Sequence, residues 1–89
     1  MKAIITVIGG DKVGIIAAIS KILANKEINI EDVNQTIMGG NFTMMMLVDL
    51  SEANVSFDEI REALIALGTE MDLSIRIQRE EIFMSMHQV

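Results

Sequence analysis

The sequence predicts an α+β protein in which two helices cover one face of a four-stranded antiparallel sheet, followed by a short C-terminal helix. Three observations predict this fold class. Four short segments have strand patterns, one apolar on both faces and three with alternating apolar residues; apolar residues recur at helical spacing in two others; and these segments follow the order β-α-β-β-α-β. Two right-handed βαβ units interleaved in one sheet give the ferredoxin-like sandwich, which we expect to span residues 1–89 as a single domain.

The first strand is predicted at residues 2–8, which are apolar on both faces and therefore typical of a central strand. The first helix is predicted from apolar residues that return to one side of a helix: Ile15, Ile19, Ile22 and Leu23. We expect Asp11 to cap this helix, because its carboxylate could accept hydrogen bonds from the first free N–H groups.

A β-hairpin is predicted in the middle of the chain. In residues 28–38 the apolar pattern slips by one position after Ile30, which indicates a bulge and hence an edge strand. Residues 39–41, Gly-Gly-Asn, are typical of a tight turn. The strand that follows should bury the side chains of one face: Phe42, Met44, Met46, Val48 and Leu50.

The second helix opens at Ser56 and Glu59, which have the spacing of a capping box, and Gly68 is expected to end it. Its predicted buried stripe is Phe57, Ile60, Leu64 and Leu67. Residues 71–79 then alternate as a strand with one buried side: Met71, Leu73, Ile75 and Ile77. Residues 80–89 could form a short helix.

The sheet face opposite the helices is predicted to be apolar at four positions: Ile4, Ile8, Met45 and Leu47. Such a face is too apolar to be left in water. It could be covered by the C-terminal segment, through Ile82, Phe83 and Met86, or by a second subunit. We expect a combination of the two and predict a homodimer.

Composition excludes several kinds of function. Seven basic residues against thirteen acidic ones give a net charge of −6, which disfavours nucleic acids and anionic membrane surfaces. An RNA-binding sheet of this topology also needs exposed aromatic side chains, and Phe42 is expected to point inward. No apolar run reaches the ~18–20 residues of a membrane span. The absence of cysteine excludes disulfides and thiolate sites and fits a cytoplasmic location.

We expect no metal and no cofactor. Met44, Met45 and Met46 could suggest thioether ligands for Cu(I), but the middle side chain on a strand points away from its neighbours, and Met commonly fills cores that are short of aromatics. His87 is the only histidine, so a Ser-His-Asp set is not plausible and no catalytic residue is expected. A small acylphosphatase-like hydrolase remains an alternative, because Lys12 in the first loop could hold phosphate as a point charge.

The loop after the first strand, GGDKVG at residues 9–14, suits a small anionic ligand. Its glycines let the backbone come close to a ligand, and the N-terminus of the following helix adds partial positive charge that favours a carboxylate. Two of its residues have competing structural roles, Asp11 as the helix cap and Gly14 in tight packing of helix against strand.

The stretch GGDKVGIIAAISKILANKEINIEDVNQ resembles the ACT domain, in which a Gly-x-Asp-x-x-Gly-Ile loop leads into the first helix and an Asn-Ile pair opens the second strand. Here these positions are Gly9, Asp11, Gly14 and Ile15, followed by Asn29 and Ile30. The resemblance covers essentially the whole chain. It is strongest to the short bacterial proteins of uncharacterised function that consist of a single ACT domain, and more distant to the glycine cleavage system repressor.

The resemblance implies a regulatory homodimer without catalytic activity that binds a small molecule of the amino-acid class. The ligand would lie between the first loop of one subunit and the start of the second strand of a neighbour. The implied ligand-binding residues are Gly10, Asp11, Lys12, Val13, Gly14, Ile15, Asn29 and Ile30. Many ACT loops carry Arg-Pro where this one has Lys12-Val13. A separate regulated protein is a further implied partner. The alternative is a ligand-free module of the same fold that serves only protein–protein assembly.

Overall fold

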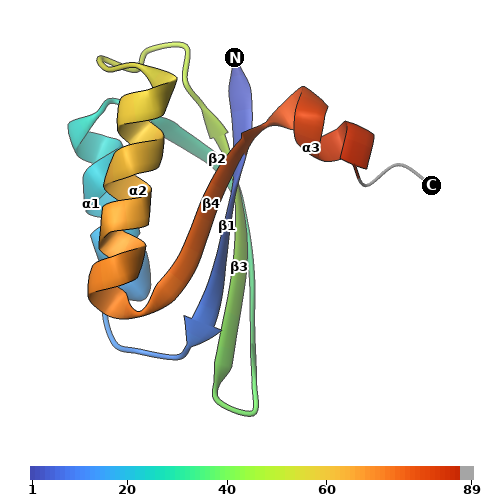
Figure 1. Ribbon diagram of the computed structural model, residues 1–89. Coiled ribbons are helices and arrows are strands. Elements are labelled where there is room, and N and C mark those ends of the chain that lie inside the picture. Colours follow the sequence, from blue (N-terminus) through green and yellow to red (C-terminus); the bar gives the residue numbers. More distant parts are fainter. Residues whose placement is uncertain (87–89) are drawn as a thin grey trace.

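Four antiparallel strands and three helices make up the structure, a computed structural model that describes residues 1–86 (Figure 1). The strands are β1 (Lys2–Gly10), β2 (Asn29–Met38), β3 (Asn41–Asp49) and β4 (Leu73–Arg79). The helices are α1 (Ile15–Asn25), α2 (Phe57–Met71) and α3 (Glu80–Met86). The strand order is β2-β3-β1-β4, and α1 and α2 lie together on one face of the sheet. The predicted ferredoxin-like fold is therefore confirmed, with β2 at an edge.

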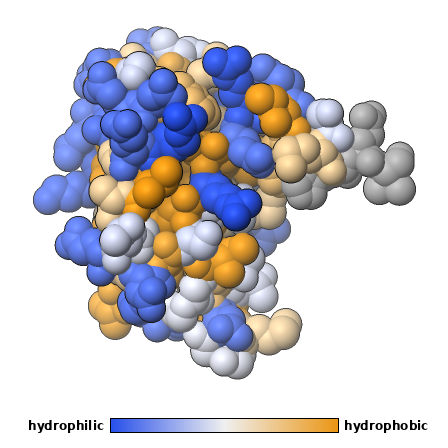
Figure 2. All heavy atoms as spheres, viewed as in Figure 1, coloured by the Kyte–Doolittle hydropathy of each residue, from blue (hydrophilic) through white to orange (hydrophobic). Residues whose placement is uncertain are grey.

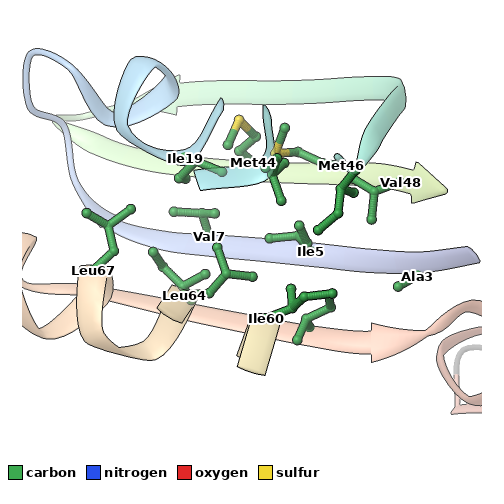
Figure 3. Close-up of a cluster of buried hydrophobic side chains, with 14 of the residues drawn as sticks. Ala3, Ile5, Val7, Ile19, Met44, Met46, Val48, Ile60, Leu64 and Leu67 are labelled. Carbon is green, nitrogen blue, oxygen red and sulfur yellow. The ribbon is translucent and has the colours of Figure 1, made fainter. Parts of the chain in front are cut away.

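The core lies between the sheet and the two long helices (Figure 3). Every second side chain of β1 and β3 is buried against the helices: Ala3, Ile5, Val7, Phe42, Met44, Met46 and Val48. The helices contribute the predicted stripes, which consist of Ile15, Ile19, Leu23, Ile60, Leu64 and Leu67. Ile22 and Phe57 are only half-buried, because they pack against the margin of the core.

Helix α2 begins as predicted but ends later. The Ser56 hydroxyl accepts a hydrogen bond from the Glu59 N–H at 3.2 Å and so caps the helix. Gly68 does not end it: α2 continues to Met71, which is therefore helical rather than part of a strand. A Cβ on Gly68 would lie 2.6 Å from the Leu73 carbonyl oxygen, so this glycine serves close packing of α2 against β4.

Strand β2 is an exposed edge. The predicted bulge is confirmed between Ile30 and Asp32, where the pairing with β3 shifts by one residue. Ile30 is the only half-buried residue of β2, and the other nine are exposed. Three of those exposed side chains, Val33, Ile37 and Met38, are apolar. One side of β2 thus keeps its backbone N–H and C=O groups free to pair with another strand.

The sheet face that turns away from α1 and α2 carries the four apolar side chains predicted for it. Ile8 and Met45 are exposed, and Ile4 and Leu47 are half-buried. Helix α3 stands on this side of the sheet at one end, where the Gln78 Nε2 donates a hydrogen bond to the Met86 Sδ at 3.5 Å. The expected cover by the C-terminal segment is therefore confirmed at that end for Met86, whereas Ile82 lines a hollow with Phe57 and Arg61 of α2. Over residues 1–86, no helix is long and apolar enough to cross a membrane.

Candidate ligand-binding site

The loop between β1 and α1 is attached to the β2–β3 hairpin. The Asp11 N–H donates a hydrogen bond to the Gly40 carbonyl oxygen at 2.9 Å. The residue at the N-cap position of α1 is Gly14, with φ 89°, and no side chain caps this helix. The prediction that Asp11 is the cap is therefore wrong, because the turn at Gly14 places Asp11 three residues before the N-cap.

Gly14 has a conformational role, and the expectation that it serves helix–strand packing is also wrong. A Cβ on Gly14 would meet nothing within 4 Å, but its positive φ is one that other residues adopt only with strain. The packing role belongs to Gly9, where a Cβ would lie 2.5 Å from the Leu73 Cδ2. The close packing expected at Gly14 is therefore found at Gly9, and Gly14 serves the turn.

A cavity of about 310 Å³ lies between this loop, the first turn of α1 and the outer part of the hairpin. Its lining is Asp11, Lys12, Gly14, Ile15, Ile16, Ala17, Gln35, Ile37 and Phe42. The N–H groups of Ile15, Ile16 and Ala17 have no partner within the helix, because the first turn of any α-helix leaves such groups unpaired. The cavity therefore combines free backbone donors with apolar side chains.

Four of the eight predicted residues line this cavity: Asp11, Lys12, Gly14 and Ile15. Gly10 ends β1, outside the cavity lining, and Val13 points fully into solvent. Lys12 extends toward α2, where its Nζ donates a hydrogen bond to the Met71 carbonyl. That carbonyl lies at the negative end of the α2 dipole, so the lysine charge is partly compensated there.

The structure adds residues that the loop motif alone does not indicate. Gln35 and Ile37 reach the cavity from β2, and Phe42 reaches it from β3. The signal that could have found them is the hairpin register, since Gly10 pairs with Asn41 and Asn41 pairs with Met38. Alternate residues just before Met38 then point to the helix side of the sheet, beside the loop.

Asn29 and Ile30 lie at the other end of the sheet. Asn29 pairs with Asp49, which pairs with Lys2 at the start of β1. The distance along β2 from Asn29 to Met38, beside the loop, is nine residues, or roughly 30 Å. Within one chain the structure does not bring these two residues to the cavity.

The start of β2 carries its own ion pair. The Lys2 Nζ lies 2.9 Å from the Glu31 Oε1 across β3. The hydrogen bond and charge of Glu31 raise the pKa of the Lys2 ammonium. This contact links the bulge of β2 to the first residues of β1, and because both side chains reach solvent it adds little to stability.

No group of three His, Cys, Asp or Glu side chains among residues 1–86 is arranged to hold a metal ion. His87 lies outside the described residues. Met44 and Met46 are buried while Met45 points to the opposite face, so the three thioethers do not converge. The chemistry of the cavity is therefore that of backbone amides, one carboxylate, one carboxamide, the Lys12 ammonium and apolar side chains.

The family model of the ACT domain matches residues 2–78 of this chain. The chain belongs to the ACT-domain family. A UPF0237 protein from Clostridium acetobutylicum is 58% identical to this ACT-domain chain over 89 residues, which is the full length of both. The solved ACT domain protein from Streptococcus pneumoniae has a TM-score of 0.80 and 42% identity, with 93% of each chain covered.

Two larger proteins contain a similar ACT-type fold. A protein described as a glycine cleavage system transcriptional repressor has a TM-score of 0.72 and 27% identity, over 86% of this chain and 44% of that one. A formyltetrahydrofolate deformylase from Pseudomonas syringae has a TM-score of 0.76 and 27% identity, over 88% of this chain and 27% of that one. A similar fold therefore occurs in a protein described as a transcriptional repressor, and it also forms a small part of an enzyme.

Proposed function

We propose that this protein is a regulatory ACT module that binds a free amino acid in the first-loop cavity and acts as a homodimer. The observation that carries the proposal is the first turn of α1, whose unpaired N–H groups open into a cavity with an apolar floor. An α-amino acid presents a carboxylate, an ammonium and a side chain on one carbon. Each of these groups has a matching partner in the cavity.

The carboxylate suits the N-terminus of α1, where the helix dipole adds about half a positive charge to the free amides. The ammonium suits Asp11, which lines the cavity and forms no ion pair with any of residues 1–86. The amino-acid side chain would lie toward Phe42 and Ile37, beside the Gln35 carboxamide. This arrangement favours an amino acid with a small or apolar side chain.

A second copy supplies the missing part of the site. If two β2 strands pair antiparallel about Val33, the start of the partner's β2, with Asn29 and Ile30, comes to lie alongside the end of β2 that lines the cavity. The exposed backbone edge and the apolar side chains of β2 support such pairing. In this arrangement the partner's Ile30 closes the outer wall of the cavity beside Ile37.

A ligand bound at the interface between two β2 strands would couple ligand binding to dimer formation. A ligand held by both copies favours the paired state, and pairing in turn raises the affinity for the ligand. The paired and unpaired states then present different surfaces to a separate regulated protein, which is how a module with this cavity would report an amino-acid level in the cytoplasm.

The test is a set of thermal melts in the presence of each of the twenty amino acids. A ligand at 100 times its dissociation constant stabilises the native state by about 2.7 kcal/mol, so its amino acid raises the melting temperature by several degrees. Asp11→Asn should abolish this rise. The control is Glu62→Gln, an exposed carboxylate on α2 far from the cavity, which should keep it.

If none of the twenty amino acids shifts the wild-type melting temperature, the sensor proposal is overturned in favour of the assembly module. Turnover of an acyl phosphate that is lost in Lys12→Met would also overturn it, in favour of the hydrolase.

A further inference from the structure

The face of the sheet that turns away from α1 and α2, called the open face below, is apolar on its middle strands and polar along β4. The apolar residues are Ile4, Ile8, Met45 and Leu47. The side chains that β4 contributes are Ser74, Arg76 and Gln78. Helix α3 projects from the sheet on this side (Figure 1), and apolar atoms reach the surface on it and over the strands (Figure 2). The part of the open face beside α3 therefore combines polar and apolar groups.

A hollow of about 420 Å³ lies there between β1, β4 and α3. The pairing of β1 with β4 sets its arrangement, since Thr6 pairs with Arg76 and Ile8 pairs with Ser74. The complete lining is Thr6, Ile8, Ser74, Arg76, Gln78 and Met86. Four polar side chains thus come together on neighbouring positions of one strand pair, with an apolar residue at either end.

The polar groups of this hollow are largely without partners. The side chains of Thr6, Ser74 and Arg76 form no hydrogen bond or ion pair with any of residues 1–86. The Gln78 Nε2 donates only to the Met86 Sδ, and a thioether is a weak acceptor. Among the described residues, no carboxylate lines the hollow. A guanidinium, two hydroxyls and a carboxamide can therefore all donate hydrogen bonds to a ligand.

We propose that this hollow binds a small α-keto acid. The ligand's carboxylate suits Arg76, whose planar guanidinium can donate two parallel hydrogen bonds to it. Its keto oxygen only accepts hydrogen bonds, which suits the Thr6 and Ser74 hydroxyls. Its short carbon chain would lie against Ile8 or Met86.

The charge of the hollow selects among anions. One guanidinium balances one carboxylate, whereas a phosphate monoester carries about −1.5 to −2 at pH 7 and would bring uncompensated charge to a protein whose net charge is −6. An amino acid would bring its ammonium near Arg76, with no carboxylate in the lining to pair with it. The first-loop cavity differs in this respect, because it contains Asp11.

The other carboxylates near this face do not line the hollow. Asp32 and Glu80 line a separate hollow of about 250 Å³. Asp32 lies on β2, three strands from β4 or roughly 14 Å, which exceeds the Debye length of about 8 Å at physiological ionic strength. Glu81 is exposed on α3, five residues after Arg76. Arg76 therefore determines the sign of the charge inside the hollow.

This site does not depend on the proposed function, since it uses neither the first-loop cavity nor the β2 edge. Strands β2 and β4 are the two opposite edges of the sheet, so a dimer that forms through β2 leaves the hollow accessible. Asp11→Asn changes only the first site and Arg76→Gln changes only the second. The two proposals therefore fail separately.

The test follows backbone amide signals by NMR while pyruvate, α-ketobutyrate or α-ketoisovalerate is added to the whole chain. At least one of the three should shift the Thr6, Ser74 and Arg76 amides with a saturable dependence on its concentration. Valine, which has an ammonium in place of the keto oxygen of α-ketoisovalerate, should not shift these amides at the same concentrations. The methyl ester of the same keto acid should not shift them either, because it lacks the negative charge.

Variants separate the roles of the side chains. Arg76→Gln should weaken binding about ten-fold or more, and Thr6→Val several-fold, because each removes a donor to the ligand. Arg76→Lys keeps the charge but loses the paired donors, so it should bind between wild type and Arg76→Gln. The matched control is Lys21→Gln, which removes one positive charge from the exposed side of α1 and should keep the wild-type affinity.

Three results would overturn the proposal. The first is that none of the three keto acids shifts these amides in the wild type. The second is that valine or inorganic phosphate shifts them at the same concentrations as the keto acids. The third is that Arg76→Gln, shown to be folded by the dispersion of its amide signals, keeps the wild-type affinity.

Discussion

The side-chain ammonium of Lys12 donates a hydrogen bond to the backbone carbonyl of Met71, fifty-nine residues further along the chain. The donor belongs to the loop before α1 and the acceptor to the last turn of α2. A positive charge at the C-terminal end of a helix interacts favourably with the helix dipole. The first loop is therefore anchored on both sides, to α2 through Lys12 and to the hairpin through the Asp11 N–H.

Lys12→Met removes this contact and keeps most of the length of the side chain. We expect the free energy of unfolding to fall by about 0.5 kcal/mol, since the site is exposed and screened by water. Urea denaturation measures the change. Lys21→Met, on the exposed side of α1, serves as the control and should change stability by less than the error of the measurement.

Gly68→Ala should destabilise the protein although alanine favours helices. Its methyl group would lie 2.6 Å from the Leu73 carbonyl oxygen, so α2 and β4 must move apart, at a cost of about 1–3 kcal/mol. Gly10→Ala is the matched control, because a Cβ there meets nothing within 4 Å. Equal stability of the two variants in urea denaturation would contradict the packing role of Gly68.

Capping and ligand binding can be separated with two alanine variants. Ser56→Ala removes the N-cap of α2 and should cost about 0.5–2 kcal/mol. Asp11→Ala should leave the ligand-free stability within about 0.5 kcal/mol of wild type, because no side chain caps α1. A large loss of ligand-free stability in Asp11→Ala, measured by urea denaturation, would restore a structural role for this carboxylate.

The decrease of the free energy of unfolding at acidic pH should depend on Asp49. Its Oδ1 accepts hydrogen bonds from the Ser51 hydroxyl at 2.6 Å and from the Ser51 N–H at 2.9 Å, and these bonds lower the pKa of the carboxyl below its usual 3.8. A carboxyl group whose pKa is lower in the folded state than in the unfolded state stabilises the folded state at pH values above the unfolded pKa. This contribution is lost as the pH falls through the pKa of the folded state.

Wild type should therefore lose stability more steeply than Ser51→Ala as the pH falls below 3.8, with the two curves converging at the lowest pH. Urea denaturation at a series of pH values between about 5 and 2 measures the difference. Ser85→Ala, on the exposed α3, is the control and should follow the wild-type slope. Parallel curves for wild type and Ser51→Ala would contradict the assignment.

The sequence patterns predicted the strands, the helices, the bulge in β2 and the apolar residues of the open face, because each depends on local periodicity. The errors were at Asp11, Gly14 and Gly68, where a short motif has more than one structural use. A glycine inside a helix and a glycine that ends one look the same locally. Only the approach of Leu73, set by the sheet, distinguishes them.

The site was predictable in part for a related reason. The loop motif identified Asp11, Gly14 and Ile15, which line the cavity. It could not indicate Gln35 or Phe42, because their position depends on the register of the hairpin. Asn29 lies at the far end of β2, so its part in the site depends on a second copy, and a single sequence carries no register between copies.

The most direct test of the account follows backbone amide signals by NMR while each amino acid is added to the protein. We predict that one amino acid shifts the Ile16 and Asn29 amides together at the same ligand concentration, although the two lie at opposite ends of the fold in one chain. Shifts confined to residues outside the cavity, or no shifts with any amino acid, would contradict a ligand site shared between two copies.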